Sequence, residues 1–176
     1  MGVFKAIQER RSIRRYSSRP VEEEKLQKVL EAARLAPSAR NSQLWKFIVV
    51  RDEGTRKQLA EAAPRGQFIK DAPVVIVACG LSPGFMSCGQ ARHTVDVSIA
   101  VSFMILEAYE LGLGTCWLGC HDPVRFRKIL GIPDDVEIVA VTPLGYPDET
   151  PAPKPRKALD EIVCYERWGQ PSTIEQ

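Results

Sequence analysis

The sequence has little histidine: His93 and His121 are the only two in 176 residues. Neither has a serine or cysteine neighbour in a recognisable motif, so the nucleophile–base pattern of covalent catalysis is missing. Cys88 with His93 could form half of a metal site, but no second pair has the spacing of metal ligands. We therefore expect no catalytic side chain and no bound metal ion.

Long hydrophobic runs are also missing. The longest apolar stretch, around residues 99–106, is far shorter than the ~20 residues of a membrane-spanning helix. Residues 1–16 hold no apolar block long enough for a secretory signal. Ala6 stands where a myristoylation motif has Ser or Thr. These features predict a soluble, cytoplasmic protein that does not partner a membrane.

An excess of one charge is absent as well, since 24 Lys and Arg against 22 Asp and Glu give a net charge of +2. This balance does not indicate a general polyanion binder. The arginines that crowd residues 10–19 could form a solvated face or a nucleic-acid patch. No interleaved aromatic residues or nucleic-acid fold signature accompany them, so we expect no nucleic-acid partner.

The number of cysteines is odd, and their spacing does not suit a disulfide framework. Cys116 and Cys120 are four positions apart, which differs from the spacing of three in a thioredoxin-type motif. A redox role for these two stays open. We expect most of the five to be buried apolar side chains: Cys79, Cys88, Cys116, Cys120 and Cys164.

The composition that is present, 44% hydrophobic and 26% charged, is typical of a globular protein. We expect one domain over residues 1–176, and the alternation of helices and strands indicates an α/β or α+β sandwich, of which we expect the α+β class. Expected helices cover residues 3–10, 20–36, 55–63, 93–111 and 123–130, and expected strands cover 47–50, 73–79, 115–118 and 136–144. Residues 81–91 are expected to form a loop.

We expect two segments to bury apolar side chains against parts of the protein that are distant in sequence or against another subunit. The helix at 93–111 is apolar around most of its circumference, so it is buried on several sides, in a core or between subunits. Residues 147–176 are expected to form an extended arm, because closely spaced prolines forbid regular structure: Pro147, Pro151, Pro153 and Pro155. The arm carries apolar side chains that must be buried somewhere: Val163, Tyr165 and Trp168.

Three short motifs carry the candidate chemistry. The segments Arg10-Arg11-Ser12-Ile13-Arg14 and Lys154-Pro155-Arg156 offer cations and a hydroxyl, which suit a phosphate. A phosphate monoester carries about −1.5 to −2 charges near neutral pH, so more than one cation is expected around it. Arg10 and Arg14 are four apart and would project from one helix face if the helix persists.

The third motif is the segment Pro37-Ser38-Ala39-Arg40-Asn41-Ser42-Gln43-Leu44-Trp45. The carboxamides of Asn41 and Gln43 each carry a donor and an acceptor, as the polar edge of a flavin ring requires. Taken alone, the segment could equally be a helix stop followed by a strand start, since Pro, Ser and Asn favour turns.

In this order the three motifs resemble the signature of the FMN-dependent nitroreductase family: Arg-Arg-Ser-x-Arg, then Pro-Ser-x-x-Asn-x-Gln-Pro-Trp, then Lys-x-Arg. The likeness runs roughly over residues 3–168, with Leu44 where the family commonly has Pro. The resemblance implies a mixed, largely antiparallel sheet between helical layers. It also implies an intertwined homodimer in which the arm at 147–176 wraps the partner.

The resemblance further implies a flavin site. It brings Arg156 to the same phosphate as Arg10, and places Arg14 nearer the ring, where a cation stabilises reduced flavin. It packs the Asn41 and Gln43 loop over the flavin from the other subunit, and points a backbone amide near Leu118-Gly119 at flavin N5. The implied cofactor-binding residues are Arg10, Arg11, Ser12, Arg14, Pro37, Ser38, Asn41, Gln43, Leu118, Gly119, Lys154 and Arg156.

The glycines at 112, 114 and 119 do not form a dinucleotide fingerprint, because they follow a helix and precede a strand. Without a Rossmann segment for the adenylate half of FAD, FMN is the expected flavin. The resemblance implies an enzyme that takes hydride from NADH or NADPH and reduces nitro-aromatic, quinone or similar small-molecule acceptors by a ping-pong mechanism. Flavin fragmentation, dehalogenation, azoline dehydrogenation and flavin binding without turnover remain alternatives. The acceptor and the choice between NADH and NADPH stay open.

Overall fold

The computed structural model describes residues 2–170, and its centre is an antiparallel sheet of four strands in the order β1-β2-β4-β3. The strands are β1 Trp45–Val50, β2 Val74–Gly80, β3 Gly114–Thr115 and β4 Glu137–Gly145. All seven residues of β2 are buried, because β1 and β4 flank the strand and helices cover both of its faces. Its run of Val, Ile and Ala is typical of such a central strand.

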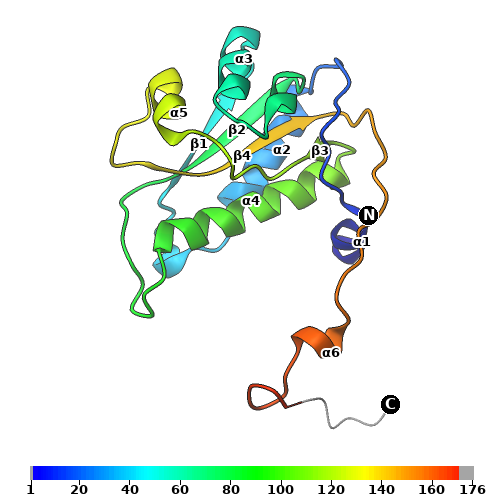
Figure 1. Cartoon of the computed structure of the whole chain (residues 1–176), viewed down its shortest axis with the longest axis vertical. Helices are drawn as coiled ribbons and strands as arrows, with labels where there is room; N and C mark the ends of the chain where they lie inside the picture. The colour runs from blue at the N-terminus through cyan, green and yellow to red at the C-terminus, as the bar shows by residue number, and fades with distance from the viewer. Residues whose placement is uncertain (1, 171–176) are drawn as a thin grey trace.

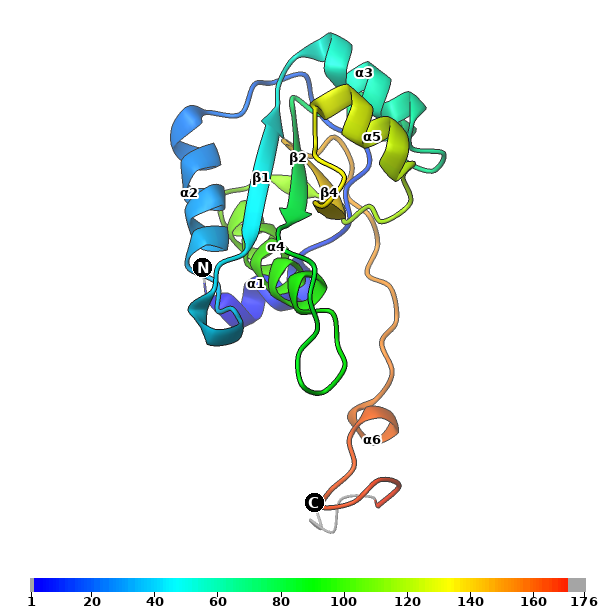
Figure 2. The ribbon, with the colours of Figure 1, turned by 90° about the vertical axis from the view of Figure 1, so that its left-hand side faces the viewer.

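The helices form two layers, one on each face of the sheet (Figures 1 and 2). They are α1 Val3–Glu9, α2 Glu23–Arg34, α3 Glu53–Glu61, α4 Arg92–Glu110, α5 Pro123–Leu130 and α6 Leu159–Ile162, with two 3-10 turns, η1 Ala39–Asn41 and η2 Gln67–Lys70. Helices α2 and α4 pack on one face, and α3 and α5 on the other. This arrangement confirms the expected α+β sandwich.

Alternate side chains of β2 enter the two cores. Val74 and Ile76 join the cluster beneath α2 and α4, whereas Val75 and Val77 join the cluster beneath α3 and α5. The split follows from strand geometry, because successive side chains point to opposite faces of a sheet.

Helix α5 has the local signals that its sequence predicts. The Asp122 side chain accepts the N–H groups of Val124 at 3.0 Å and Arg125 at 3.1 Å, and Pro123 occupies the first turn. Gly131 ends the helix with φ 65° and ψ 33°, a left-handed conformation that glycine adopts without a Cβ penalty.

Helix α1 does not persist far enough for Arg10 and Arg14 to share a face of it. Helix α1 ends at Glu9, and Ser12 then pairs in parallel with Thr115 while the N–H of Ile13 donates to the Thr115 carbonyl at 2.8 Å. The reason is tertiary: Ile13 fills the space that a Cβ on Gly114 would take, 2.7 Å from Ile13 Cγ1. All pairs of the four strands are antiparallel, and this isolated bridge adds one parallel pairing at the edge of the sheet.

The strand expected at 115–118 is also shorter than the pattern indicated. Ladder pairing stops at Thr115, and only an isolated bridge between Leu118 and Val141 continues the edge. The two residues between them depart from the ladder, so that Cys116 is buried and the Trp117 side chain is 38% exposed.

The expectation of mostly buried cysteines is wrong. Cys79 and Cys116 are buried, while the other three are exposed because they lie in loops and in the arm: Cys88, Cys120 and Cys164. All five are free thiols.

Beyond Tyr146 the chain leaves the sheet and runs past α1, away from the body (Figures 1 and 2). Its only regular element among the described residues is the one-turn helix α6. The large apolar side chains beyond Ala158 stay open to solvent in the single chain: Leu159 75%, Ile162 62%, Tyr165 42% and Trp168 98% exposed. The swapped arm therefore stays a prediction. Among residues 2–170, we find no helix with the length and apolar character needed to cross a membrane.

Candidate functional site

Two adjoining cavities lie beside the arginine-rich segment. The first, of about 380 Å³, is lined by Ile7, Arg10, Ser12, Ser102, Ile105, Leu106, Thr115 and Trp117, and we call it the Ser12 cavity. The second, of about 250 Å³, is lined by the same Arg10, Ile105 and Thr115 together with Glu149 and Pro151, and we call it the Glu149 cavity. Arg10 thus lies on the wall that the two cavities share.

The end of α1 sets the direction of Arg10. Its backbone N–H donates to the Ala6 carbonyl at 3.0 Å and closes the helix. The Arg11 guanidinium donates to the carbonyls of Gln8 and Arg10, both at 2.8 Å, so this cation satisfies the helix C-terminus. Arg10 has no side-chain partner in the part of the chain that the structure describes. Of the two neighbours, Arg10 is therefore the one available to an anion.

Glu149 joins the start of the arm to the arginine-rich segment. Its Oε1 accepts the backbone N–H groups of Arg14 at 2.5 Å and Arg15 at 3.2 Å. The N–H of Asp148 donates to the Arg15 carbonyl at 2.9 Å, and Tyr16 pairs with Pro147. These contacts make the arm begin beside Arg10, although the two segments are more than 130 positions apart.

Lys154 and Arg156 follow on the arm, and both are exposed without an ion pair among residues 2–170. Arg156 is five positions beyond Pro151, which lines the Glu149 cavity with Arg10. A fully extended chain spans at most ~18 Å over that distance. The structure therefore brings the root of the arm to Arg10, whereas the expectation that Arg156 binds the same phosphate stays a prediction.

Burial controls the titratable groups behind the Ser12 cavity. Desolvation raises the pKa of the Cys116 thiol, which counts against a thiolate at neutral pH. Burial likewise raises the pKa of the Tyr16 phenol far above its ordinary value, and its hydroxyl donates to the Ile13 carbonyl at 2.5 Å. Burial therefore favours the uncharged form of both groups.

The loop that carries Asn41 and Gln43 lies at the opposite end of α4. It contains residues with positive φ, namely Arg40 at 56°, Asn41 at 54° and Gln43 at 50°. The Ser38 hydroxyl accepts the N–H of Gln43 at 3.0 Å, and the Gln43 amide donates to the Asn41 carbonyl at 3.1 Å. Pro37, Asn41 and Gln43 are exposed.

Helix α4 contacts both this loop and the Ser12 cavity, so the separation between them can be estimated along the helix axis. Asp96 accepts the N–H of Ala39 from the loop at 3.1 Å, whereas Ser102 and Ile105 line the cavity six and nine positions later. At 1.5 Å per residue these positions lie ~9 and ~14 Å from Asp96 along the helix. No residue of the loop lines the Ser12 cavity.

The backbone N–H groups of Leu118 and Gly119 differ in their hydrogen bonding. The N–H of Leu118 donates to the Val141 carbonyl at 2.9 Å, so it is occupied within the sheet. Gly119 is exposed, and its N–H has no acceptor within residues 2–170. It lies two positions after Trp117, which lines the Ser12 cavity. The amide expected to face a flavin is therefore best assigned to Gly119.

Sequence reasoning missed several residues that the fold brings to this region. Thr115 and Trp117 were expected only as part of the strand at 115–118 and not as residues of the site. Ile105 follows from no motif, and neither does Glu149, whose contacts span 135 positions.

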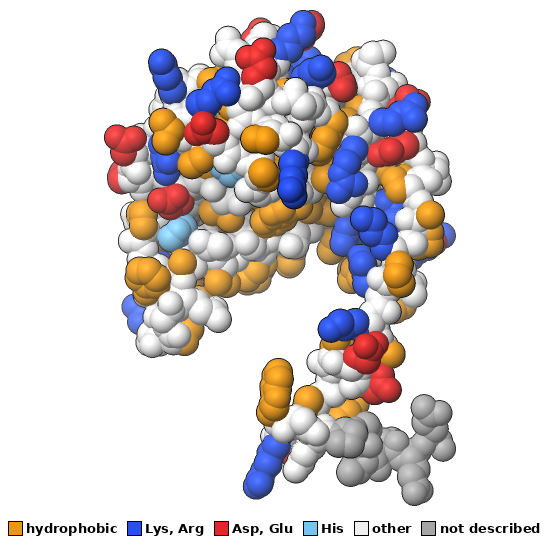
Figure 3. Space-filling model, in the orientation of Figure 1, with side chains coloured by type: hydrophobic (Ala, Val, Ile, Leu, Met, Phe, Trp, Pro, Cys, Tyr) orange, Lys and Arg blue, Asp and Glu red, His pale blue; other side chains and the backbone are white. Residues whose placement is uncertain are grey.

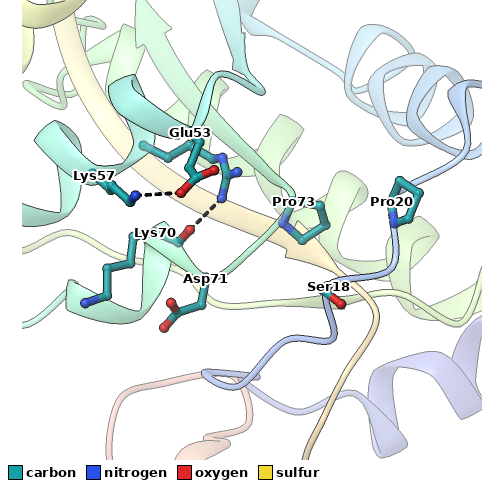
Figure 4. Close-up of a pocket in the computed structure, with 8 residues that line it drawn as sticks. Ser18, Pro20, Glu53, Lys57, Lys70, Asp71 and Pro73 are labelled. Atoms are coloured by element: carbon teal, nitrogen blue, oxygen red, sulfur yellow. Dashed lines mark hydrogen bonds and ion pairs between the residues drawn. The ribbon is translucent and has the colours of Figure 1, made fainter.

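A further cavity, of about 400 Å³, lies between α3 and the segment that precedes α2 (Figure 4). Its charges are largely satisfied within the protein: Lys57 pairs with Glu53 at 2.5 Å, and Arg56 donates to the Lys70 carbonyl at 2.5 Å. None of the expected cofactor-binding residues lines it. We therefore place the candidate site at the Ser12 cavity.

Comparison with known proteins shows which family this chain resembles. A Methanothermobacter thermautotrophicus protein, provisionally named an NADH dehydrogenase/NAD(P)H nitroreductase, is 40% identical over 177 residues, covering 96% of this chain and 88% of the relative. The FMN reductase [NAD(P)H] of Bacillus subtilis is 30% identical, covering 94% and 74%.

Among solved structures, a nitroreductase family protein from Clostridium difficile 630 is 35% identical, with a TM-score of 0.85 and coverage of 95% of this chain and 99% of that one. The family model described as Nitroreductase family matches residues 7–67 and 63–146. These segments contain the arginine-rich motif, the Asn41 and Gln43 loop and the cavity-lining part of α4. The chain therefore belongs to the nitroreductase family.

Proposed function

We propose that this protein binds FMN at the Ser12 cavity, takes hydride from NADH or NADPH, and reduces a nitro-aromatic, quinone or similar small molecule. The observation that carries the proposal is the convergence of Arg10, Ser12, Thr115 and Trp117 on one cavity. These residues come from two segments about a hundred positions apart, paired by the Ser12–Thr115 bridge. One relative is named as an NADH dehydrogenase/NAD(P)H nitroreductase and another as an FMN reductase [NAD(P)H], which supports an oxidoreductase activity with NAD(P)H.

The residues present fit a phosphorylated flavin. The cavity volume of about 380 Å³ lies in the range usual for ligand pockets. Arg10 offers a cation without a side-chain partner among the described residues, and the Gly119 N–H has no acceptor there. FMN, when bound, supplies the hydride-accepting ring. Arg10, Ser12, Lys154 and Arg156 would hold its phosphate, and Gly119 would donate to the ring.

We further propose that the working form is a homodimer, because a single chain leaves the site incomplete. No residue of the Asn41 and Gln43 loop lines the Ser12 cavity, and its contact with α4 at Asp96 lies ~9 Å or more along the helix from the cavity, so a second chain would supply the loop. The chain also exposes apolar side chains on α1 and α4: Val3 72%, Phe4 71%, Ile7 52% and Phe103 41%. Figure 3 shows hydrophobic side chains along the edge of the body that faces the arm.

An apolar hollow supports the same proposal. A cavity of about 500 Å³ between α1 and α4 is lined mainly by apolar residues: Val3, Ala6, Ala32, Phe103 and Leu106. Apolar surface of this kind is typical of an interface with another chain. The arm, with Trp168 98% exposed, provides apolar side chains of the kind that a partner could bury.

The test is flavin binding followed by reduction. The purified protein should show a flavin absorption spectrum, which should bleach on anaerobic mixing with NADH or NADPH. Arg10→Ala should lose charge-assisted hydrogen bonds of ~1.5–3 kcal/mol, weakening FMN binding roughly ten- to a hundredfold. Arg34→Ala is the matched control, because Arg34 lies on α2 and pairs only locally with Glu31. Equal FMN affinity in both variants would contradict the phosphate assignment.

A further inference from the structure

The carboxylate of Asp96 is buried beneath the loop that carries Asn41 and Gln43. Asp96 lies on α4 and is 2% exposed. Its Oδ1 accepts the N–H of Ala39 at 3.1 Å, from a residue 57 positions away. Its Oδ2 is buried and has no hydrogen-bond partner within residues 2–170. Burying a carboxylate costs free energy unless hydrogen bonds compensate for the lost water, so an apolar residue would pack at this position more favourably.

The contact with Ala39 replaces a missing cap. Ser38 precedes η1 in the capping position, but its side chain makes no cap hydrogen bond to that turn. The Ser38 hydroxyl instead accepts the N–H of Gln43 at 3.0 Å, at the far end of the loop. The first N–H of a helical turn has no partner of its own. Asp96 supplies that partner from a different element of the fold.

The loop needs to be held, because its backbone is strained. Arg40, Asn41 and Gln43 have φ of 56°, 54° and 50°, a left-handed conformation that is unfavourable for residues with a Cβ. Such conformations persist only where the surroundings determine them. The Ser38 and Asp96 side chains provide two such restraints, and only Asp96 ties the loop to a long helix.

We propose that Asp96 is a positioning residue, which fixes the conformation of residues 38–43 and so sets where Asn41 and Gln43 meet a flavin. The inference rests on the proposed function for its flavin step. Its first step, the dependence of the loop on Asp96, concerns the protein alone and is testable without a cofactor.

The first experiment uses flavin-free protein and three variants. Asp96→Ala removes the acceptor, whereas Asp96→Asn keeps an amide oxygen for the Ala39 N–H. Val97→Ala is the control: Val97 is 0% exposed and packs in the core beneath the sheet, so it should affect stability but not the loop. Loss of the Ala39 contact should speed hydrogen exchange at the Ala39 amide and tryptic cleavage after Arg40 by roughly tenfold in Asp96→Ala only. Unchanged exchange and cleavage in Asp96→Ala would overturn the proposal.

The second experiment measures the flavin. FMN titration should show roughly tenfold weaker binding in Asp96→Ala, with affinity close to the parent in Asp96→Asn and Val97→Ala. The reduction potential of bound FMN should become more negative in Asp96→Ala, because misplaced carboxamides stabilise reduced flavin less well. A loosened loop with unchanged FMN affinity and potential would make Asp96 merely structural and overturn its positioning role. A parent protein that binds no FMN would instead overturn the proposed function and the flavin step together, while the Ala39 exchange rate would still decide the first step.

Discussion

Glu149 Oε1 lies 2.5 Å from the backbone nitrogen of Arg14, and this contact joins residues 135 positions apart. The same oxygen accepts the N–H of Arg15 at 3.2 Å. A carboxylate that accepts two backbone N–H groups makes charge-assisted hydrogen bonds, which are stronger than neutral ones. The arm therefore leaves the body at a fixed place, on the wall of the cavity that also contains Arg10.

We predict that Glu149→Ala releases the root of the arm and weakens FMN binding. Loss of the two contacts should cost ~1.5–3 kcal/mol, so FMN affinity should fall roughly tenfold or more as Lys154 and Arg156 lose their starting point. Titration of FMN into each variant measures this effect. Glu149→Gln keeps an acceptor oxygen without the charge and should lie between the parent and Glu149→Ala. An FMN affinity in Glu149→Ala equal to that of the parent would show that the arm reaches the phosphate without this contact.

A truncation after Lys157 should separate the two proposed roles of the arm. It keeps Glu149, Lys154 and Arg156 but removes the apolar segment that contains Ile162 and Trp168, 62% and 98% exposed in the single chain. We expect loss of the dimer in analytical ultracentrifugation, with loss of bound FMN because the partner's loop leaves. Truncation after Gln170 is the control and should keep both. A dimer that persists after the shorter truncation, with FMN bound, would contradict the swapped arm.

Much of the fold could be predicted from local signals. The unbroken Val and Ile run of β2 and the Asp122, Pro123 and Gly131 signals of α5 are each properties of adjacent residues, so the sequence displays them directly. The path of the chain after α1 could not be predicted in this way. The helix ends at Glu9, close to the expected residue 10, but the pairing of Ser12 with Thr115 depends on Ile13 packing where Gly114 has no side chain.

The candidate site, too, could be predicted from the sequence only in part. The motifs containing Arg10, Ser12 and Asn41 were visible because a family resemblance names them. The contacts of Asp96 with Ala39 and of Glu149 with Arg14 were not visible, since they join positions 57 and 135 apart and neither carboxylate belongs to a motif. Such contacts depend on how helices and the arm are placed in space, which no local pattern reports.

His121 should make stability depend on pH. Burial lowers the pKa of this imidazole below its ordinary value of 6.5, and the ring lies 4.9 Å from that of Phe126. The unfolded chain therefore binds a proton more readily than the folded one, so the free energy of unfolding falls as the pH drops through and below about 6.5. In His121→Phe, urea unfolding between about pH 5 and 7 should show a flatter dependence than in the parent.

Glu22→Gln provides the control for this titration. The hydrogen bond from Tyr146 lowers the pKa of the Glu22 carboxyl to about 2. The stabilisation of the folded state by this carboxylate is therefore fully present above the ordinary pKa of a glutamate, and it is lost as the pH falls toward 2. Removing Glu22 should leave the slope above about pH 5 unchanged. A slope that survives in His121→Phe would assign the titration to another group.

The last prediction concerns the order of the reaction. If FMN binds at the Ser12 cavity as proposed, the nicotinamide and the acceptor should use the same flavin in turn. This arrangement predicts parallel double-reciprocal lines when acceptor concentration is varied at several fixed NADH or NADPH concentrations. Neither histidine should act as a base: His93 packs at Gly80 near the start of α4, and His121 packs against Phe126. In His93→Ala and His121→Ala, bound flavin should therefore be reduced at close to the parental rate. Loss of a true general base would instead slow the reaction ~10²–10⁴-fold. Intersecting lines would require a ternary complex with a second site. A hundredfold slower reduction in either variant, with FMN still bound, would identify a catalytic group that the geometry does not indicate.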